Sequence, residues 1–264
     1  MGSMLLAPLV FLAASASQAQ TASAHEHLGR TYEAGGDLEK AAAEYEQAIQ
    51  LSPYEESYYF EAAHARLLRQ QFDEAVKILE RGCKIFDKSA QLELALGVAY
   101  YGERRFEEAA GAFLRTIDIA PDVQQPYVFL SKMLDQTTDR LPDILPRFAS
   151  WAAANPNDPL AQFVYAKGLL EAGGDAAKAE QLLRASIRLK DDQWESHYEL
   201  GVLLEKQRKF PEAAAELERS AAINPKEAGV RYHLSRVYDR MGQADKAAEQ
   251  REIHKRLTDS AGGK

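Results

Sequence analysis

Apolar and small residues recur along this chain at helical spacing and at a fixed interval. Within residues 28–49, leucine, glycine and tyrosine follow one another at i, i+1 and i+4, which places them on one side of a helix. Alanine occupies positions 41, 75 and 109 and again positions 179, 213 and 247, with the same interval inside both sets. The step from Ala109 to Ala179 equals two such intervals plus two extra positions. The pattern therefore predicts a series of similar helical units.

Two further positions recur at the same interval, the first mostly apolar and the one directly after it small. We call each recurring position a slot. Small side chains let two helix backbones approach closely. The pattern therefore indicates that these residues serve helix packing rather than a catalytic or ligand-binding role. Prolines recur at the same interval as well, and two of the repeated units have aspartate in place of the proline. The apolar slot holds Leu28, Ala62, Leu96, Leu130, Ala166, Leu200 and Leu234; the small slot holds Gly29, Ala63, Gly97, Ser131, Gly201 and Ser235, with Lys167 as the exception; the prolines are Pro53, Pro121, Pro156 and Pro225.

Each repeated segment is predicted to form a hairpin of two helices. Gly35-Gly36 and Gly173-Gly174 are expected at the turn, and an acidic residue such as Asp37 follows where it can cap the second helix. A hairpin of this size cannot bury its own apolar side, so it must stack against its neighbours. Large residues are expected to fill the space beside the small ones: Tyr45, Leu79, Phe113, Leu183 and Leu217.

At these residues the chain resembles the tetratricopeptide repeat (TPR) family, whose repeat of roughly 34 residues has the pattern W-x₂-L-G-x₂-Y…A-x₃-F…P. The resemblance implies an all-α fold, an α-solenoid (right-handed superhelix) of seven TPR helical hairpins. The last copy carries Arg251 and His254 where earlier copies carry apolar or small residues, as a terminal cap would, and residues 262–264 form a tail. The array would span 22–261, with copies at 22–55, 56–89, 90–123, 124–159, 160–193, 194–227 and 228–261.

The fourth copy, 124–159, departs from the pattern. Its alanine slot falls at Asp143 or Ile144, Pro142 and Pro146 lie close together, and Trp151 replaces a small residue. We expect a displaced or shortened second helix, with Pro146 inside its first turn. Two interpretations stay open: a kink that separates repeats one to three from five to seven and shapes a binding cleft, or repeat drift with local repacking.

The leader at 1–21 differs from the rest of the chain. An uncharged apolar run at 4–14 precedes small residues at Ser17 and Ala19, which is typical of a secretory signal peptide cleaved near Ala19. The run is too short to span a bilayer. No lysine or arginine precedes it, so a disordered or tag-derived leader is the alternative. We expect export to the periplasm or cell envelope, and a cytoplasmic location if the leader is not a functional signal.

The composition and the absence of known motifs argue against several classes of function. A net charge of −8 without a basic run argues against nucleic-acid binding, which needs a basic surface. The single cysteine, Cys83, lies in an apolar helical run and is expected to be buried rather than reactive. No nucleotide-binding, serine-hydrolase or H-E-x-x-H motif occurs, and His25 and His27 face different ways on one helix. The sequence therefore predicts no enzyme, no cofactor and no metal site.

The TPR resemblance implies a concave groove lined by the first helix of each hairpin. Glu26 and Arg30 stand where the chaperone-binding TPR subclass has lysine and asparagine, which argues against chaperone docking. Carrying the family's groove positions onto this chain gives the candidate peptide- or protein-binding residues Arg30, Phe60, His64, Tyr101, Lys132, Tyr198, Tyr232 and Arg236.

These features favour a non-enzymatic scaffold that binds a protein or peptide partner in the groove, within a cell-envelope assembly. The alternative is an accessory glycan- or enzyme-binding module of a polysaccharide export or synthesis system, because aromatic residues can also stack on sugars. Membrane association is expected only through the leader or a partner. The oligomeric state is left open.

Overall fold

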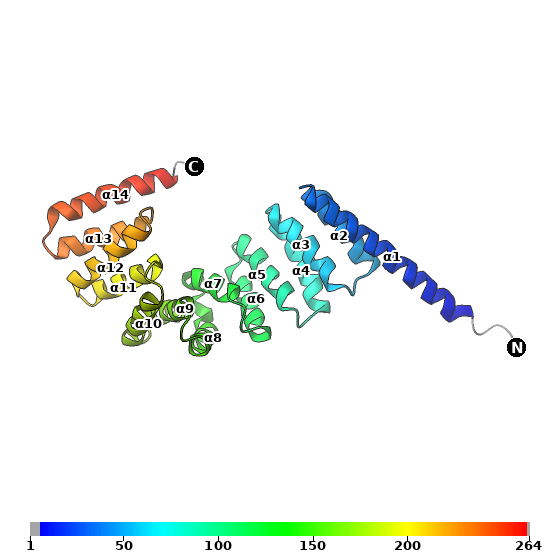
Figure 1. The fold of residues 1–264 in the computed structure, drawn as a ribbon, viewed down its shortest axis with the longest axis horizontal. Coiled ribbons are helices and arrows are strands. Elements are labelled where there is room, and N and C mark those ends of the chain that lie inside the picture. The colour runs from blue at the N-terminus through cyan, green and yellow to red at the C-terminus, as the bar shows by residue number, and fades with distance from the viewer. Residues whose placement is uncertain (1–5, 263–264) are drawn as a thin grey trace. The chain divides into compact units, whose positions relative to one another are not determined.

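The computed structural model describes the backbone of residues 6–262 and the side chains of residues 17–260. This part of the chain contains helices and no strand, as expected for an all-α protein (Figure 1). The helices are α1 (Leu6–Ala34), α2 (Leu38–Leu51), α3 (Glu56–Leu68), α4 (Phe72–Ile85), α5 (Ala90–Gly102), α6 (Phe106–Ile119), α7 (Gln125–Lys132), α8 (Leu141–Ala154), α9 (Pro159–Glu171), α10 (Ala176–Leu189), α11 (Trp194–Lys206), α12 (Phe210–Ile223), α13 (Ala228–Arg240) and α14 (Ala244–Gly262).

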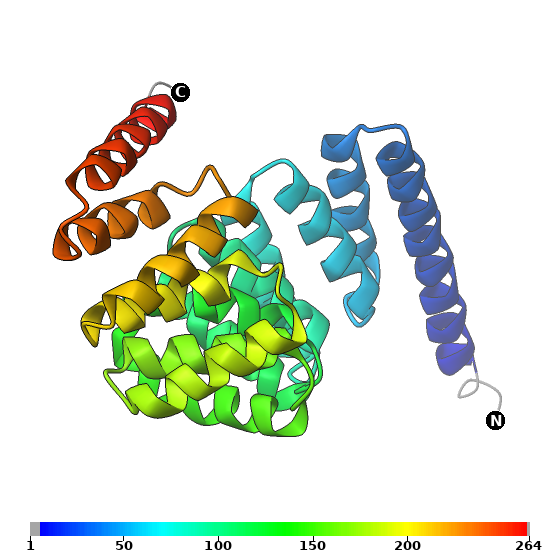
Figure 2. The same ribbon diagram turned by 60° about the vertical axis from the view of Figure 1, so that its left-hand side comes forward.

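Within each of the chain's two compact units, successive helices pack side by side in chain order. The pairs α1–α2, α3–α4, α5–α6, α9–α10, α11–α12 and α13–α14 form hairpins, and the second helix of each packs on the first helix of the next (Figure 2). The chain divides into two compact units, residues 1–140 and 141–264. Within each unit the contacts are those of the solenoid-type stacking that the repeat pattern predicts.

The small slot lies where it was expected, against the large side chain of the second helix. A Cβ atom added to Gly97 would lie 2.5 Å from the Phe113 ring, and one added to Gly201 would lie 2.6 Å from Leu217. The large partners Tyr45, Phe113 and Leu217 are fully buried. The core of each unit is thus a row of such contacts between neighbouring helices.

The fourth repeat corrects one expectation from the sequence. The second helix, α8, has 14 residues, as α4 and α6 do, so the expected shortening of this helix is wrong, while its displacement is still a prediction. The first helix is the short one: α7 has 8 residues, and two 3₁₀ turns follow it, Leu134–Gln136 and Thr138–Arg140. Met133, Leu134 and Thr137 are buried here, so this segment packs against the core although it is not an α-helix.

The positions and exposure of the two prolines in α8 explain why this helix is intact. Pro142 is its second residue, but Pro146 lies beyond the first turn, contrary to expectation. Both prolines are exposed, so water can satisfy the carbonyl group that loses its partner. Ile144 rather than Asp143 fills the alanine slot and is fully buried, and Trp151 is buried as well. The kink and the repeat-drift interpretations are both still predictions.

The N-terminal helix, α1, continues without a break from the leader into the first repeat. Residues 1–5, and the side chains of the apolar run as far as residue 16, lie outside the described part. The leader boundary at residue 21 and its cleavage therefore stay predictions. Among the described residues, no helix combines the length and the apolar character needed to cross a membrane.

Candidate protein-binding surfaces

The candidate residues all lie on the first helices of the hairpins. In the first unit α3 contacts α5 and α5 contacts α7, and in the second unit α11 contacts α13, so first helices lie next to one another. We call their solvent-facing side the first-helix face, made by α1, α3, α5 and α7 in the first unit and by α9, α11 and α13 in the second. Each unit presents its own first-helix face.

At the N-terminal end of the first unit, the candidates interact with acidic neighbours. Arg30 forms an ion pair with Glu26 one turn earlier, at 2.7 Å. The rings of Phe60 and His64 are stacked with centroids 5.7 Å apart, and His64 Nδ1 lies 3.5 Å from an oxygen of Glu33 on α1. Arg30 is therefore already partnered, and Phe60 and His64 act as a pair.

Farther along this unit, Tyr101 and Lys132 line a common pocket of about 300 Å³ together with Arg104, Phe106 and Gln136. The Tyr101 ring meets Phe106 edge-on at a centroid distance of 5.8 Å. It also meets Phe129 of α7 edge-on at 5.4 Å, and the ring of Phe129 stacks on the buried Phe113. The core thus fixes the aromatic wall of the pocket.

Two cationic side chains, Arg104 and Lys132, also line this pocket. The guanidinium group of Arg104 lies 6.0 Å from the centre of the Phe106 ring, and neither Arg104 nor Lys132 has an ion-pair partner among the side chains of residues 17–260. In a protein with a net charge of −8, two unpaired cations beside partly exposed rings are available to an anionic group of a ligand. The arrangement can hold such a group by charge and by ring contact.

The second unit places Tyr198, Tyr232 and Arg236 around His233. The ring centroids of Tyr198 and Tyr232 lie 5.7 and 5.3 Å from that of His233. Arg236 lies over the Tyr232 ring at 5.5 Å, and Tyr232 is 46% exposed. Burial raises the pKa of Tyr198 to about 12, so its hydroxyl stays neutral. Tyr232 is therefore the accessible ring of this group.

Glu205 fixes the charged side chains of that group. One of its oxygens lies 2.6 Å from His233 Nδ1 and the other lies 3.1 Å from Arg236 Nε, while Glu205 itself is buried. Arg236 is thus neutralised on one side, unlike Arg104 and Lys132 in the first unit. The second unit offers mainly aromatic contact, and the first unit offers aromatic and cationic contact.

The structure brings some candidates together and leaves others apart. Phe60 lies with His64, Tyr101 lies with Lys132, and Tyr232 lies with Arg236, whereas Arg30 stands with Glu26 alone. Whether these side chains contact a partner is still a prediction. The groove positions of the resemblance cover only first helices, so they missed residues from the hairpin turn, from the second helix and from the segment after α7: Arg104, Phe106 and Gln136.

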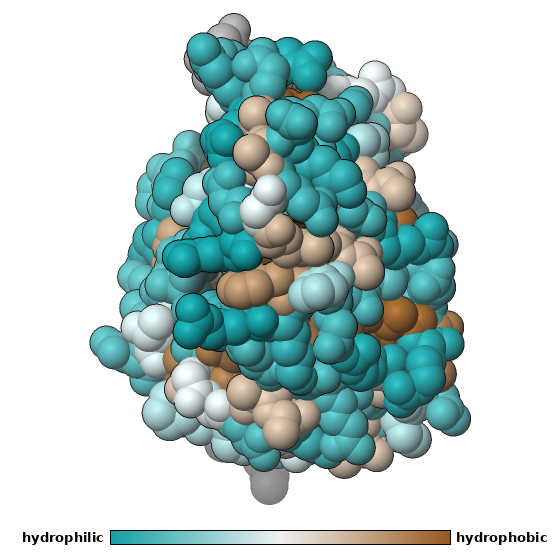
Figure 3. Space-filling view, turned by 90° about the vertical axis from the view of Figure 1, so that its left-hand side faces the viewer, coloured by the Kyte–Doolittle hydropathy of each residue, from teal (hydrophilic) through white to brown (hydrophobic). Residues whose placement is uncertain are grey.

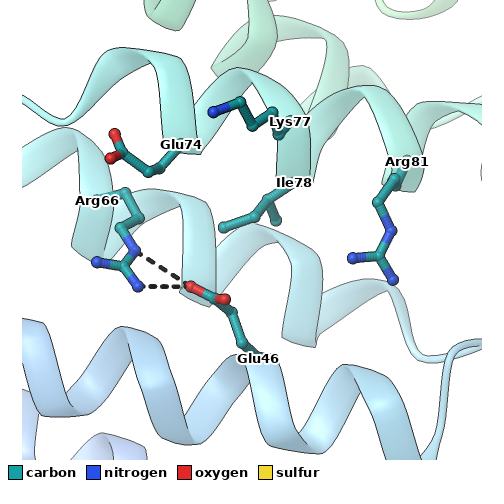
Figure 4. Close-up of a pocket in the computed structure, with 6 residues that line it drawn as sticks. All are labelled: Glu46, Arg66, Glu74, Lys77, Ile78 and Arg81. Atoms are coloured by element: carbon teal, nitrogen blue, oxygen red, sulfur yellow. Dashed lines mark hydrogen bonds and ion pairs between the residues drawn. The ribbon is translucent and has the colours of Figure 1, made fainter.

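A second pocket, of about 190 Å³, lies between second helices and carries mostly charged side chains (Figure 4). Arg66 of α3 donates two hydrogen bonds to one oxygen of Glu46 on α2, at 2.7 and 3.1 Å, and one to Glu39 at 2.9 Å. These bonds consume the guanidinium donors and tie consecutive hairpins together. We regard this pocket as part of the packing rather than as a ligand site.

Cys83 is partly exposed rather than fully buried, which corrects the expectation from the sequence. Its surroundings still keep the thiol inert, since burial in α4 raises its pKa to about 12. The thiolate is the reactive form, so this residue is protonated at neutral pH.

The fold and these surfaces define an all-α repeat protein with solvent-facing aromatic and charged side chains on its first helices. Two family models, both described as tetratricopeptide repeat, match residues 22–55 and residues 60–123, 165–228 and 198–251. The matches cover more than half of the chain, which belongs to the tetratricopeptide repeat family. No curated protein matches the sequence.

Solved structures with the same fold have low sequence identity to this chain. A tetratricopeptide repeat protein from Parabacteroides merdae superposes with a TM-score of 0.66 at 13% identity, covering 90% of this chain and 93% of its own. YrrB, described as a TPR protein with an unusual peptide-binding site, gives 0.57 at 16% identity, over 71% and 96%. MamA from Desulfovibrio magneticus gives 0.54 at 15% identity, over 65% and 96%. At these identities the similarity establishes the fold alone.

Proposed function

We propose that this TPR protein is a non-enzymatic scaffold that binds a protein or peptide partner on its first-helix face. The observation that carries the proposal is the pocket of Tyr101, Arg104, Phe106, Lys132 and Gln136, where two unpaired cations lie beside partly exposed aromatic rings. Aromatic and arginine side chains supply much of the binding energy at protein interfaces. The description of YrrB as peptide-binding gives a precedent within the fold.

The chemistry of the pocket favours a partner segment with a carboxylate next to an apolar or aromatic side chain. The carboxylate would accept hydrogen bonds from Arg104 and Lys132, and the neighbouring side chain would pack on Tyr101. In the second unit, Tyr198 and Tyr232 offer further ring surface to the same or another partner.

A photo-crosslinking residue placed at Gln136, an exposed uncharged residue that lines the pocket, tests this function in the native host. We expect a defined set of partner proteins to be captured there and to be missing when the same residue replaces Lys77. Lys77 is an exposed lysine on α4 that lines the other pocket. Equal capture at both positions would contradict binding on the first-helix face.

The same partners should be lost on substitution. A Tyr101→Ala/Tyr198→Ala double variant is expected to recover at least tenfold less of each partner, because it removes a ring from each first-helix face. Undiminished recovery would place the binding surface elsewhere. Glycan binding that disappears in this variant would instead favour the polysaccharide-system alternative.

We further propose that the protein works in the cell envelope after export, as part of an assembly. The proposal is supported by the apolar run at 4–14 followed by small residues at 17 and 19. N-terminal sequencing of the protein from its host tests it: a mature N-terminus near residue 20 is expected, and an intact leader on protein found in the cytoplasm would refute it.

A further inference from the structure

Three side chains with metal-ligating atoms converge on the first-helix face near the N-terminal end of the first unit. Glu33 comes from the end of α1, and Glu61 and His64 come from α3, one turn apart. One ligand atom from each residue lies within 4.8 Å of the other two. From this convergence we propose that Glu33, Glu61 and His64 bind a divalent transition-metal ion, with Zn²⁺ preferred.

The spacing fits a tetrahedral ion. Zinc bonds of about 2.0–2.2 Å to nitrogen and oxygen place adjacent ligand atoms about 3.3–3.6 Å apart. The distance from His64 Nδ1 to the Glu33 oxygen is 3.5 Å, which already matches such an edge. Glu61 lies one turn from His64 on the same helix, and its ligand atom lies within 4.8 Å of those of Glu33 and His64. Three protein ligands would leave the fourth position open to water.

Residues outside the three ligands hold two of them in place. The hydroxyl of Tyr45 on α2, which is fully buried, donates a hydrogen bond of 2.9 Å to the other oxygen of Glu33. This bond orients the carboxylate so that its second oxygen faces His64. The ring of Phe60 stacks on His64 and limits its rotation. Hydrogen bonds and packing of this kind commonly orient the ligands of metal sites.

The donor set indicates the class of ion. One imidazole and two carboxylates suit zinc and other divalent first-row metals, whereas magnesium and calcium prefer oxygen alone. The two carboxylates also repel each other when the site holds no cation. Arg30 acts on Glu61 by its charge but already forms an ion pair with Glu26. Burial together with Glu33 still raises the pKa of Glu61. A bound divalent ion would offset this repulsion, which a neutral imidazole cannot do.

The competing interpretation is an ion pair between Glu33 and protonated His64 without a metal. Isothermal titration of the chelator-treated full chain with Zn²⁺ at pH 7.5 separates the two. We expect one tightly bound zinc per chain, in the micromolar range or below. Magnesium added at a hundredfold excess is expected not to compete. Absence of saturable zinc binding would overturn the proposal in favour of the ion pair.

The site is assigned by substitution. Glu61→Gln and His64→Ala should each weaken zinc binding at least tenfold, because each removes a ligand with little effect on helix packing. His25→Ala is the matched control: His25 lies on α1 and pairs with Glu44 at 2.6 Å, but no third ligand among the described side chains joins them. Unchanged binding in Glu61→Gln, or loss in His25→Ala alone, would refute the assignment. Circular dichroism of each metal-free variant checks that it folds.

Discussion

Glycine in the small slot marks a contact between two helices of one hairpin. At Gly97 the ring of Phe113 occupies the space that any larger side chain would need, and a Cβ there would lie 2.5 Å from ring carbon Cε1. Phe113 is fully buried and stacks on Phe129, so it cannot withdraw easily. Glycine at this position is therefore a steric requirement of the fold.

Gly97→Leu should lower the free energy of unfolding of the first unit by about 1–3 kcal/mol through overpacking. Urea denaturation followed by circular dichroism measures this change. Gly111→Leu is the control, because a Cβ at Gly111 on α6 would meet only the ends of arginine side chains at 3.4 Å or more. If the two variants are equally stable, the contact with Phe113 does not constrain position 97.

A second residue-scale feature lies at the hairpin turns. In the described part of the chain, six turns contain a residue with positive φ, and the amide of the next residue donates to a carbonyl five residues earlier, as at Lys209 and Leu204. Glycine adopts this conformation without strain, but three turns use larger residues. The residues with positive φ are Gly36, Gln70, Arg104, Gly173, Arg208 and Gly242.

Arg208→Gly should raise the free energy of unfolding by about 0.5–1 kcal/mol, since relief of left-handed strain exceeds the added flexibility of the unfolded chain. Arg208→Ala removes the same side chain but keeps the strain, so it should bring no such gain. The midpoints of urea unfolding compare the two variants. A glycine variant no more stable than the alanine variant would show that the turn is unstrained.

At the scale of elements, His197 connects three segments of the second unit. It lies on α11 and is buried; its Nδ1 is 2.7 Å from a carboxylate oxygen of Glu216 on α12, and its Nε2 is 3.0 Å from the carbonyl of Asp191. Both partners are acceptors, so both ring nitrogens donate when the imidazole is charged. Burial lowers the pKa of His197, but these two hydrogen bonds outweigh it and raise the pKa above its usual value.

The stability of the second unit should therefore depend on pH. Because the folded-state pKa of His197 is raised, its contribution is complete below the unfolded value of about 6.5 and is lost as the pH rises through the folded value. Thermal melts between pH 6 and 9 should show a midpoint that falls with rising pH. The loss should be about 1 kcal/mol, the scale of one hydrogen bond. His197→Gln should flatten this part of the profile, and an unchanged slope would exclude His197 as the cause.

The sequence predicted the hairpins and their turns, because the repeat records contacts that every copy makes in the same way. It failed in part in the fourth repeat, where the prolines suggested a displaced or shortened second helix. The first helix is the short one, and Met133, Leu134 and Thr137 are buried directly after it. It also missed the convergence of Glu33 with Glu61 and His64. Periodicity aligns equivalent positions, but it does not show which non-equivalent side chains meet between neighbouring helices.

At the scale of the whole molecule, charge and hydrophilic side chains mark the surface that Figure 3 shows. The face in Figure 3 carries mainly hydrophilic residues with small separate apolar patches, in keeping with the net charge of −8. The last hairpin also carries a hydrophilic residue where earlier hairpins are apolar. Leu183 and Leu217 occupy equivalent positions in their hairpins and are fully buried. The same position of the last hairpin holds Arg251 on α14, which is exposed and forms an ion pair with Asp239 at 2.7 Å.

Arg251→Leu should therefore turn the outer side of α14 into a stacking surface like that of the earlier hairpins. In an earlier hairpin this slot contacts the first helix of the next repeat as well as that of its own, as Phe113 does with Phe129 on α7 and with Gly97 on α5. The variant should therefore self-associate more than the parent at equal concentration. Size-exclusion chromatography with light scattering measures the shift in mass. Arg256→Leu is the control, because it adds the same apolar side chain at an exposed position of α14 outside the repeat slot. Equal masses for all three proteins would mean that one polar residue does not limit stacking at this end, and that shape rather than charge keeps the last hairpin free.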